Sequence, residues 1–166
     1  MSFPQLLSHT DLPPFAELQY LSDWETDDKA NRCISFWQYA HALHELDKAG
    51  AITVQVKKIL KELYIENSPL GDNELKNRLQ VKHGIVARGQ AGLGGFGKKL
   101  LDQLKRDFHP FQFPVPGKAT GNVNLQVFLD LVRDKKSRPF KFYYCLRSRF
   151  RAALAQCFGD STIRSW

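Results

Sequence analysis

The sequence predicts an all-α protein: a compact bundle of five or six helices with a glycine-rich loop and an extended proline-rich loop. Several segments carry apolar residues at steps of three and four, the spacing of one buried helix face. No segment shows the sustained alternation of apolar and polar residues that marks a half-buried strand. The chain has 166 residues, 43% of them hydrophobic and 25% charged, which suits a globular domain with a core of its own.

Two parts are expected along the chain, an N-terminal arm at 1–26 and a helical domain at 27–166. The arm holds Pro4, Pro13 and Pro14 among scattered aromatic residues, so it is expected to pack on the domain without folding alone. We expect helices at about 27–49, 52–66, 72–82, 97–108, 123–135 and 139–158.

The ends of these helices have sequence signals. Asp27 and Asp28 are expected at the N-terminus of the first helix, where acids complement the helix dipole, and Gly50 is expected to end it. Pro110 cannot continue the fourth helix, and Pro139 suits the first turn of the last. The expected buried stripes of the last two helices are Leu125, Phe128, Leu129 and Val132, and Tyr143, Leu146, Phe150, Ala153, Leu154 and Cys157.

The glycine-rich loop is expected between His83 and Gly97, with six of the eleven glycines of the chain, and the proline-rich loop at 110–121. Residues 92–97 match the pattern G-x-G-x-x-G, but no strand is expected before them, so a dinucleotide site is not predicted. Lys99 stands where a phosphate-binding loop needs Ser or Thr. Two interpretations stay open: a flexible connector, or a helix N-terminus that holds a nucleic-acid phosphate.

No catalytic, cofactor or metal site is predicted. The five histidines lack the partners of a zinc set, and no nucleophile motif is present, so the chain is expected not to be an enzyme. No apolar run approaches the roughly 18 residues of a membrane span, and no signal peptide is recognisable. Cys33, Cys145 and Cys157 are an odd number at wide spacing, so no disulfide framework and a cytoplasmic location are expected.

The charge is distributed unevenly. The chain has a net charge of +7, but residues 1–50 hold eight acids and three bases, whereas residues 51–166 hold nine acids and 21 bases. An acidic first part and a basic remainder suggest two surfaces with different partners, and the basic one suits a polyanion.

The segment from Arg133 to Arg151 holds eight bases and one acid, interleaved with aromatic residues. Such cations neutralise phosphates and exposed rings can stack on bases, although core aromatics and solvated arginines would give the same pattern. No helix-turn-helix is predicted, because the connections between the helices are wrong in length or proline-rich, so no sequence readout is expected. The predicted nucleic-acid-binding residues are Lys57, Lys58, Lys61, Lys98, Lys99, Lys105, Arg106, Lys135, Lys136, Arg138, Lys141, Arg147, Arg149 and Arg151.

These features resemble one family, the small helical subunit of class 1, Cascade-type CRISPR effector complexes. The resemblance lies in size, helical build and basic ridges on several helices, of which Arg147 and Arg151 form one, and no diagnostic motif carries it. The first residues also read like a linker, as in subunits equivalent to the C-terminal part of the large subunit. The resemblance implies a non-catalytic subunit that lines a groove for DNA strands, with guide RNA and other subunits, copies of itself included, as partners.

A second hypothesis is a regulatory factor that binds a protein partner. Its contact surface would be the acidic first fifty residues with Trp24, Phe36 and Trp37. Salt separates the two hypotheses, because phosphate binding weakens steeply with salt and an apolar contact hardly changes.

Overall fold

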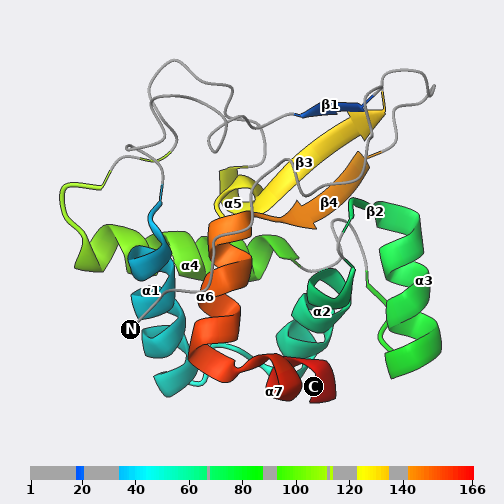
Figure 1. Ribbon diagram of the computed structural model, residues 1–166, viewed down its shortest axis with the longest axis horizontal. Coiled ribbons are helices and arrows are strands. Elements are labelled where there is room, and N and C mark those ends of the chain that lie inside the picture. Colours follow the sequence, from blue (N-terminus) through cyan, green and yellow to red (C-terminus); the bar gives the residue numbers. More distant parts are fainter. Residues whose placement is uncertain are drawn as a thin grey trace.

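The computed structural model describes residues 18–20, 34–66, 68–87, 93–111, 113, 123–134 and 142–166. The elements in these ranges are β1 (Leu18–Tyr20), α1 (Phe36–Lys48), α2 (Val54–Ile65), β2 (Leu70–Gly71), α3 (Asp72–His83), α4 (Leu93–Asp107), α5 (Val123–Gln126), β3 (Leu129–Asp134), β4 (Phe142–Leu146), α6 (Ser148–Phe158) and α7 (Asp160–Ser165) (Figure 1). The prediction of a mostly helical domain is confirmed, with seven helices in the described residues where five or six were expected.

A small antiparallel sheet accompanies the helices, in the strand order β1-β3-β4-β2. The strands β3 and β4 pair with Leu129 opposite Leu146, and β2 pairs with the other edge of β4. The strand β1 belongs to the predicted arm and pairs with β3, which attaches this part of the arm to the sheet. In Figure 1 the sheet lies above α2 and α3, while α1 and α6 pack side by side with α4 crossing behind them.

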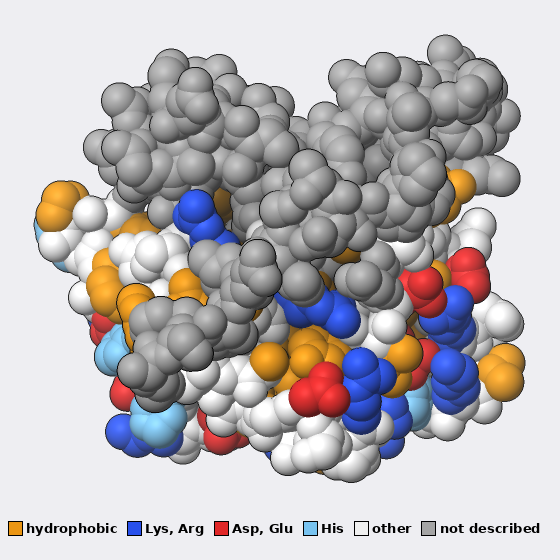
Figure 2. Space-filling view, in the orientation of Figure 1, with side chains coloured by type: hydrophobic (Ala, Val, Ile, Leu, Met, Phe, Trp, Pro, Cys, Tyr) orange, Lys and Arg blue, Asp and Glu red, His pale blue; other side chains and the backbone are white. Residues whose placement is uncertain are grey.

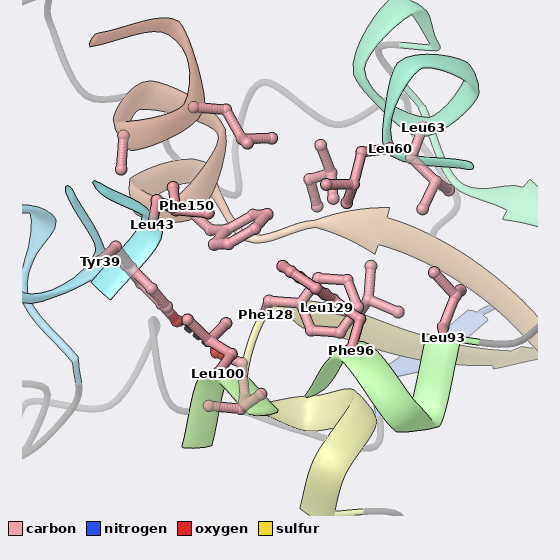
Figure 3. Close-up of a cluster of buried hydrophobic side chains, with 14 of the residues drawn as sticks. Tyr39, Leu43, Leu60, Leu63, Leu93, Phe96, Leu100, Phe128, Leu129 and Phe150 are labelled. Atoms are coloured by element: carbon pink, nitrogen blue, oxygen red, sulfur yellow. Dashed lines mark hydrogen bonds between the residues drawn. The ribbon is translucent and has the colours of Figure 1, made fainter. Parts of the chain in front are cut away.

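Aromatic side chains join these layers in the core. The ring of Phe128 lies 5.2 Å from that of Phe96 of α4 and 5.3 Å from that of Phe150 of α6 (Figure 3). Tyr39 of α1 packs on Phe150 at 5.3 Å and donates a hydrogen bond to the Val127 carbonyl. Rings at such distances and angles add to the stabilisation from burial alone. One cluster therefore connects α1, α4, α6 and the turn before β3.

The first two helices begin at capped serine and threonine residues. Ser35 accepts a hydrogen bond from Gln38 N while the Gln38 side chain accepts one from Ser35 N, a capping box that starts α1. The expected start at Asp27 is therefore wrong, because Ile34 and Ser35 are not helical. Thr53 caps α2 in the same way through Val56 N. The observed bounds of α2 and α3 lie within two residues of those expected.

The two helices expected at 123–135 and 139–158 are each a shorter helix together with a strand. The helix α5 ends at Gln126 and β3 follows, while β4 occupies 142–146 before α6 begins. The alternation that reveals a strand is missing, because Leu129 and Asp130 are both buried although they point to opposite faces of β3. The helix α7 was not expected and is separated from α6 by Gly159, whose φ of 86° breaks the helix.

The glycine-rich loop is shorter than expected, because α4 begins at Leu93 and includes three of its glycines. A Cβ atom at Gly97 would overlap the backbone carbonyl of Asn124 in α5 and press on the ring of Phe128. Gly94 and Gly95 have nothing within 4 Å of such an atom. Of these three positions, only position 97 must be glycine for α4 to pack closely on α5. Residues 88–92 and most of the proline-rich loop lie outside the described residues.

We expect Gly97→Ala and Gly95→Ala to have opposite effects on stability. The first should lower the free energy of unfolding by about 1–3 kcal/mol, because the methyl group forces α4 and α5 apart. The second should raise it by up to about 1 kcal/mol, because alanine is the better helix former at an open position. Urea denaturation of both variants measures the difference, and equal changes in midpoint would contradict the close contact at Gly97.

Candidate nucleic-acid interface

The helix α4 presents four of the predicted basic residues to solvent. Its buried side is formed by Leu93, Phe96, Leu100, Leu101 and Leu104. Lys98 and Lys105 are seven residues apart, as are Lys99 and Arg106, so each pair recurs on the same side of the helix. All four are exposed, as predicted.

Few acids compensate these charges. Lys98 Nζ lies 3.1 Å from the Asp102 carboxylate, one turn further along α4. In the described part of the chain Lys99, Lys105 and Arg106 form no ion pair within 4 Å; Arg106 donates a hydrogen bond to the neutral Gln103 side chain and, more weakly, its charge also acts on the neighbouring Asp107 carboxylate. The outward side of α4, here called the α4 surface (Lys98, Lys99, Lys105 and Arg106), is therefore available to an anionic partner.

The basic residues of α2 lie against the last helix and are half-buried. Lys61 Nζ donates a hydrogen bond to the Trp166 carbonyl oxygen at 2.9 Å. Lys57 Nζ lies 5.8 Å from the centre of the Trp166 ring. Lys58, on the same helix, is also half-buried. They form no separate ridge; Lys57 and Lys61 lie on a surface that α2 shares with α7.

The predicted ridge of Arg147 and Arg151 does not exist. Arg147 is 2% exposed and precedes α6; its Nε donates to the Gln126 carbonyl at 2.7 Å, and Nη1 lies 3.4 Å from the Asp130 carboxylate. Arg147 therefore stabilises the junction of β4 and α6 instead of contacting a phosphate. Arg149 is half-buried and donates to the Ile34 carbonyl at 3.4 Å. The remaining predicted contacts, Lys135, Lys136, Arg138 and Lys141, lie outside the described residues.

Arg151 belongs instead to a group that the sequence did not reveal. Its guanidinium lies 4.4 Å from the centre of the Tyr64 ring in α2. The Tyr64 hydroxyl donates to Asp160 at 2.8 Å, and Arg164 Nε donates to the same carboxylate at 2.9 Å. We call this group, with Lys57, Lys61 and Trp166, the α2–α7 surface. No sequence signal places Arg164 beside Tyr64 or Trp166 beside Lys57, because α7 follows a turn that only the tertiary structure fixes.

These contacts change the ionisation of the surface. Hydrogen bonds from Tyr64 and Arg164 hold the pKa of Asp160 below its usual value. Burial, and then the hydrogen bond to Asp160, raise the pKa of the Tyr64 hydroxyl. Burial lowers the pKa of the Arg151 guanidinium, which remains charged at neutral pH because arginine starts so high. Arg151 therefore still offers a positive charge to an anionic ligand.

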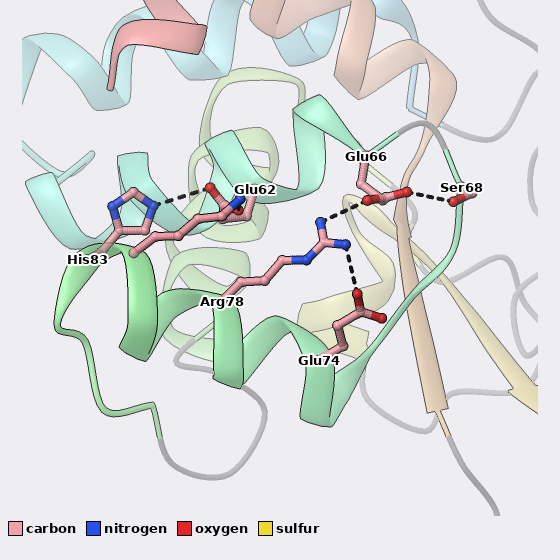
Figure 4. A network of polar contacts seen from close by, with 7 residues as sticks. Glu62, Glu66, Ser68, Glu74, Arg78 and His83 are labelled. Carbon is pink, nitrogen blue, oxygen red and sulfur yellow. Dashed lines mark hydrogen bonds and ion pairs between the residues drawn. The ribbon is translucent and has the colours of Figure 1, made fainter.

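A network of polar contacts fixes α3 on α2 (Figure 4). The buried Glu62 carboxylate lies 3.0 Å from Lys82 Nζ and 3.2 Å from His83 Nε2. Arg78 joins Glu66 and Glu74, each at 2.8 Å. Burial raises the pKa of Glu62, but the contacts from Lys82 and His83 outweigh it and the net shift is downward. Only Leu75 and Leu79 of α3 are buried, so these ion pairs carry much of its attachment.

Charges of both signs alternate on the face shown in Figure 2, where basic side chains lie beside acidic ones around α2, α3 and α7. Within the described ranges, no three His, Cys, Asp or Glu side chains are grouped so that they could hold a metal ion. None of the helices in the described part of the chain combines the length and apolar character that a membrane crossing requires.

Comparison with known proteins identifies no relative: no family model, no curated protein and no solved structure matches the chain.

We expect Glu62→Gln to lower the free energy of unfolding at neutral pH by about 2 kcal/mol, because Lys82 and His83 lose a charged partner. The folded-state pKa of Glu62 lies below its ordinary value of 4.5. Its contribution is therefore complete above that pH and disappears as the pH falls through the folded-state pKa. Urea denaturation from pH 3 to pH 7 should show a flatter acid limb for the variant. Glu74→Gln, at an exposed position, is the control; parallel profiles for wild type and Glu62→Gln would contradict this role of Glu62.

Proposed function

We propose that this chain is a non-catalytic protein that binds the backbone of nucleic acid with little regard to base sequence. The observation that carries the proposal is the α4 surface: four exposed cations on one helix, of which only Lys98 has an ion-pair partner among the described residues. Cations that are free of carboxylate partners can replace the counterions of a phosphate backbone, and the released counterions favour binding. The net charge of +7 acts in the same direction at longer range.

The order of the elements supports a duplex as the ligand. The helices α2, α3 and α4 are followed by the short helix α5 and then by the hairpin of β3 and β4, and the short strand β2 between α2 and α3 pairs with β4. Apart from α5, this order and strand pairing resemble those of winged helix-turn-helix domains. The connection of α3 to α4 is longer than the usual three or four residues, and α4 packs mainly against α1 and α5. We therefore propose from the order of the elements alone that α4 takes the place of the helix that enters the major groove in helix-turn-helix proteins.

The sequence of the hairpin connection agrees with this proposal. Residues 135–141 join β3 to β4 and contain Lys135, Lys136, Arg138 and Lys141. That these four residues contact nucleic acid stays a prediction from the sequence, because they lie outside the described residues. Base readout is not proposed: lysine and arginine can pair with guanine, but the same side chains suit the phosphate backbone, and the charge of the α4 surface is the observation that carries the proposal.

The narrower proposal is a subunit of a CRISPR effector complex in the cytoplasm. It rests on size, charge and helical build, and no relative supports it. Purification of the tagged chain from its own host, followed by sequencing of bound RNA, tests it. Repeat-derived guide RNA would be expected in the eluate, and its absence together with the absence of partner subunits would reject this assignment.

We expect Lys99→Gln/Lys105→Gln to weaken binding of duplexes of unrelated sequence to the same extent. The slope of log affinity against log salt should fall by about 1.8 if both lysines contact phosphates. Lys48→Gln/Lys76→Gln is the matched control, because it removes the same charge from lysines that are paired with Glu45 and Asp72. Fluorescence anisotropy over a salt series, with single-stranded and duplex probes, measures both variants.

Two results would contradict the proposal. Equal slopes for the two variants would mean that net charge alone, and not the α4 surface, attracts the probe. Binding that hardly changes with salt, or no binding at all, would favour the protein-partner hypothesis. Of the aromatic residues named for that hypothesis, Phe36 is buried in the core, while Trp37 is 52% exposed and Trp24 lies outside the described residues.

A further inference from the structure

We propose that the α2–α7 surface is a second phosphate-binding surface, so that one chain can hold two segments of nucleic-acid backbone at once. This inference rests on the proposed function, because it assigns the second surface to the same class of ligand.

The charge balance of this surface is positive. It contains Lys57, Lys61, Arg151 and Arg164, and Asp160 is the acid in contact with it among the described residues. The Asp160 carboxylate is already engaged, since one oxygen accepts from Tyr64 and the other from Arg164. Lys57 and Arg151, which are half-buried, form no ion pair in the described structure, whereas Lys61 donates to the main-chain oxygen of Trp166 at 2.9 Å. Two partly desolvated cations without an ion-pair partner favour an anionic ligand.

Aromatic rings hold these cations in place of carboxylates. The guanidinium of Arg151 rests over the ring of Tyr64, and Lys57 lies over the ring of Trp166, which in turn packs edge-on against Phe158 at 5.1 Å. A ring attracts the face of a guanidinium and leaves the N–H groups at its edge free to donate. Such an edge binds phosphate oxygens in pairs. The rings therefore order the cations without neutralising them.

The length of the surface suits a nucleic-acid backbone. Lys57 and Tyr64 are seven residues apart on α2, which is about 10 Å at the rise of an α-helix. One strand of a duplex advances about 3.4 Å along the helix axis for each phosphate. Successive phosphates are further apart than this rise, because the strand also winds around the axis, so the surface is long enough to meet about two of them.

The two basic surfaces are built on different helices. The helix α4 packs against α1 and α5, whereas α7 packs against α2 and α6. Lys57 and Arg164 are thus not neighbours of Lys99 and Lys105 in the sequence or on one helix. Each surface can be changed without altering the side chains of the other, and this separation makes the inference testable.

The experiment measures whether one protein joins two duplexes. A biotin-labelled duplex is fixed on beads, a fluorescent duplex of unrelated sequence is added, and its capture is followed as wild-type protein is titrated at low salt. The test variant is Lys57→Gln/Arg164→Gln, and Lys48→Gln/Lys76→Gln is the control with the same loss of charge. Anisotropy with a single duplex is measured in parallel, and light scattering compares the association state of the three proteins.

We expect the wild type and the control to capture the second duplex, and the test variant to capture about tenfold less because the second contact is lost. Its affinity for a single duplex should stay within about threefold of the control, since the α4 surface is intact. A second variant, Arg151→Lys, keeps the charge but removes the paired donors of the guanidinium, and should also reduce capture. If the first variant fails to fold, this second variant still tests the surface.

Each other outcome overturns the inference in a distinguishable way. Binding of one duplex without capture of a second by the wild type would reject the second surface and leave the proposed function standing. Equal capture by test variant and control would assign the joining of duplexes to another surface or to association of chains. Competition by polyglutamate as strong as that by unlabelled duplex would assign the surface to acidic proteins. Absence of any binding would reject the proposed function as well.

Discussion

The position of Phe128 is the constraint on which the rest of the structure depends. Its fully buried ring touches Phe96 and Phe150, its backbone carbonyl accepts a hydrogen bond from the amide of Arg147, and the ring lies where a side chain at position 97 would meet it. The residue therefore joins α4, α6 and the start of the sheet at one point. Truncation of a buried phenylalanine costs about 3–5 kcal/mol. This is a large part of a total stability of about 5–15 kcal/mol.

The charged surfaces follow from this core. The side of α4 that packs on Phe128 contains leucine and phenylalanine, so its lysines and arginine face solvent. The start of α6 is fixed by Arg147, which places Arg151 over Tyr64 and next to α7. The basic residues therefore form two groups on different helices. The packing of the aromatic core buries Arg147, which stabilises the fold, and leaves Arg151 and Arg164 where they can contact a ligand.

The sequence predicted those parts of the fold in which local signals and tertiary packing agree. Thr53 caps a helix with a regular apolar stripe, and α2 lies where it was expected. The α4 surface was predicted for the same reason, because leucines at helical spacing fix the opposite side. The first turn of α4 was not predicted, because the low helix propensity of its glycines suggested a loop. The buried residues Leu93 and Phe96 nevertheless continue the helical spacing of Leu100.

The secondary structure of residues 123–147 could not be predicted correctly from the spacing of their apolar residues. Leu125, Phe128, Leu129 and Val132 recur as on a helix, but the chain bends at Val127 and Phe128 into a strand in which Leu129 and Asp130 are both buried. The run of aromatic residues in β4 was a strand signal that the helical spacing outweighed. Arg147 looked like its neighbours Arg149 and Arg151, and only the fold shows that its partner is Asp130.

Gly97 also bears on how this sequence can vary. Of the glycines in the first turns of α4, only Gly97 lies against another backbone, so selection for folding acts on that one position and leaves Gly94 and Gly95 free to drift. Natural variants of this chain should therefore lose the glycine-rich character of the stretch while keeping a single glycine at its end. The match to a nucleotide-binding pattern is then a coincidence of composition. The feature that distant relatives should share is one glycine that stands three residues before a buried leucine pair, and not the motif itself.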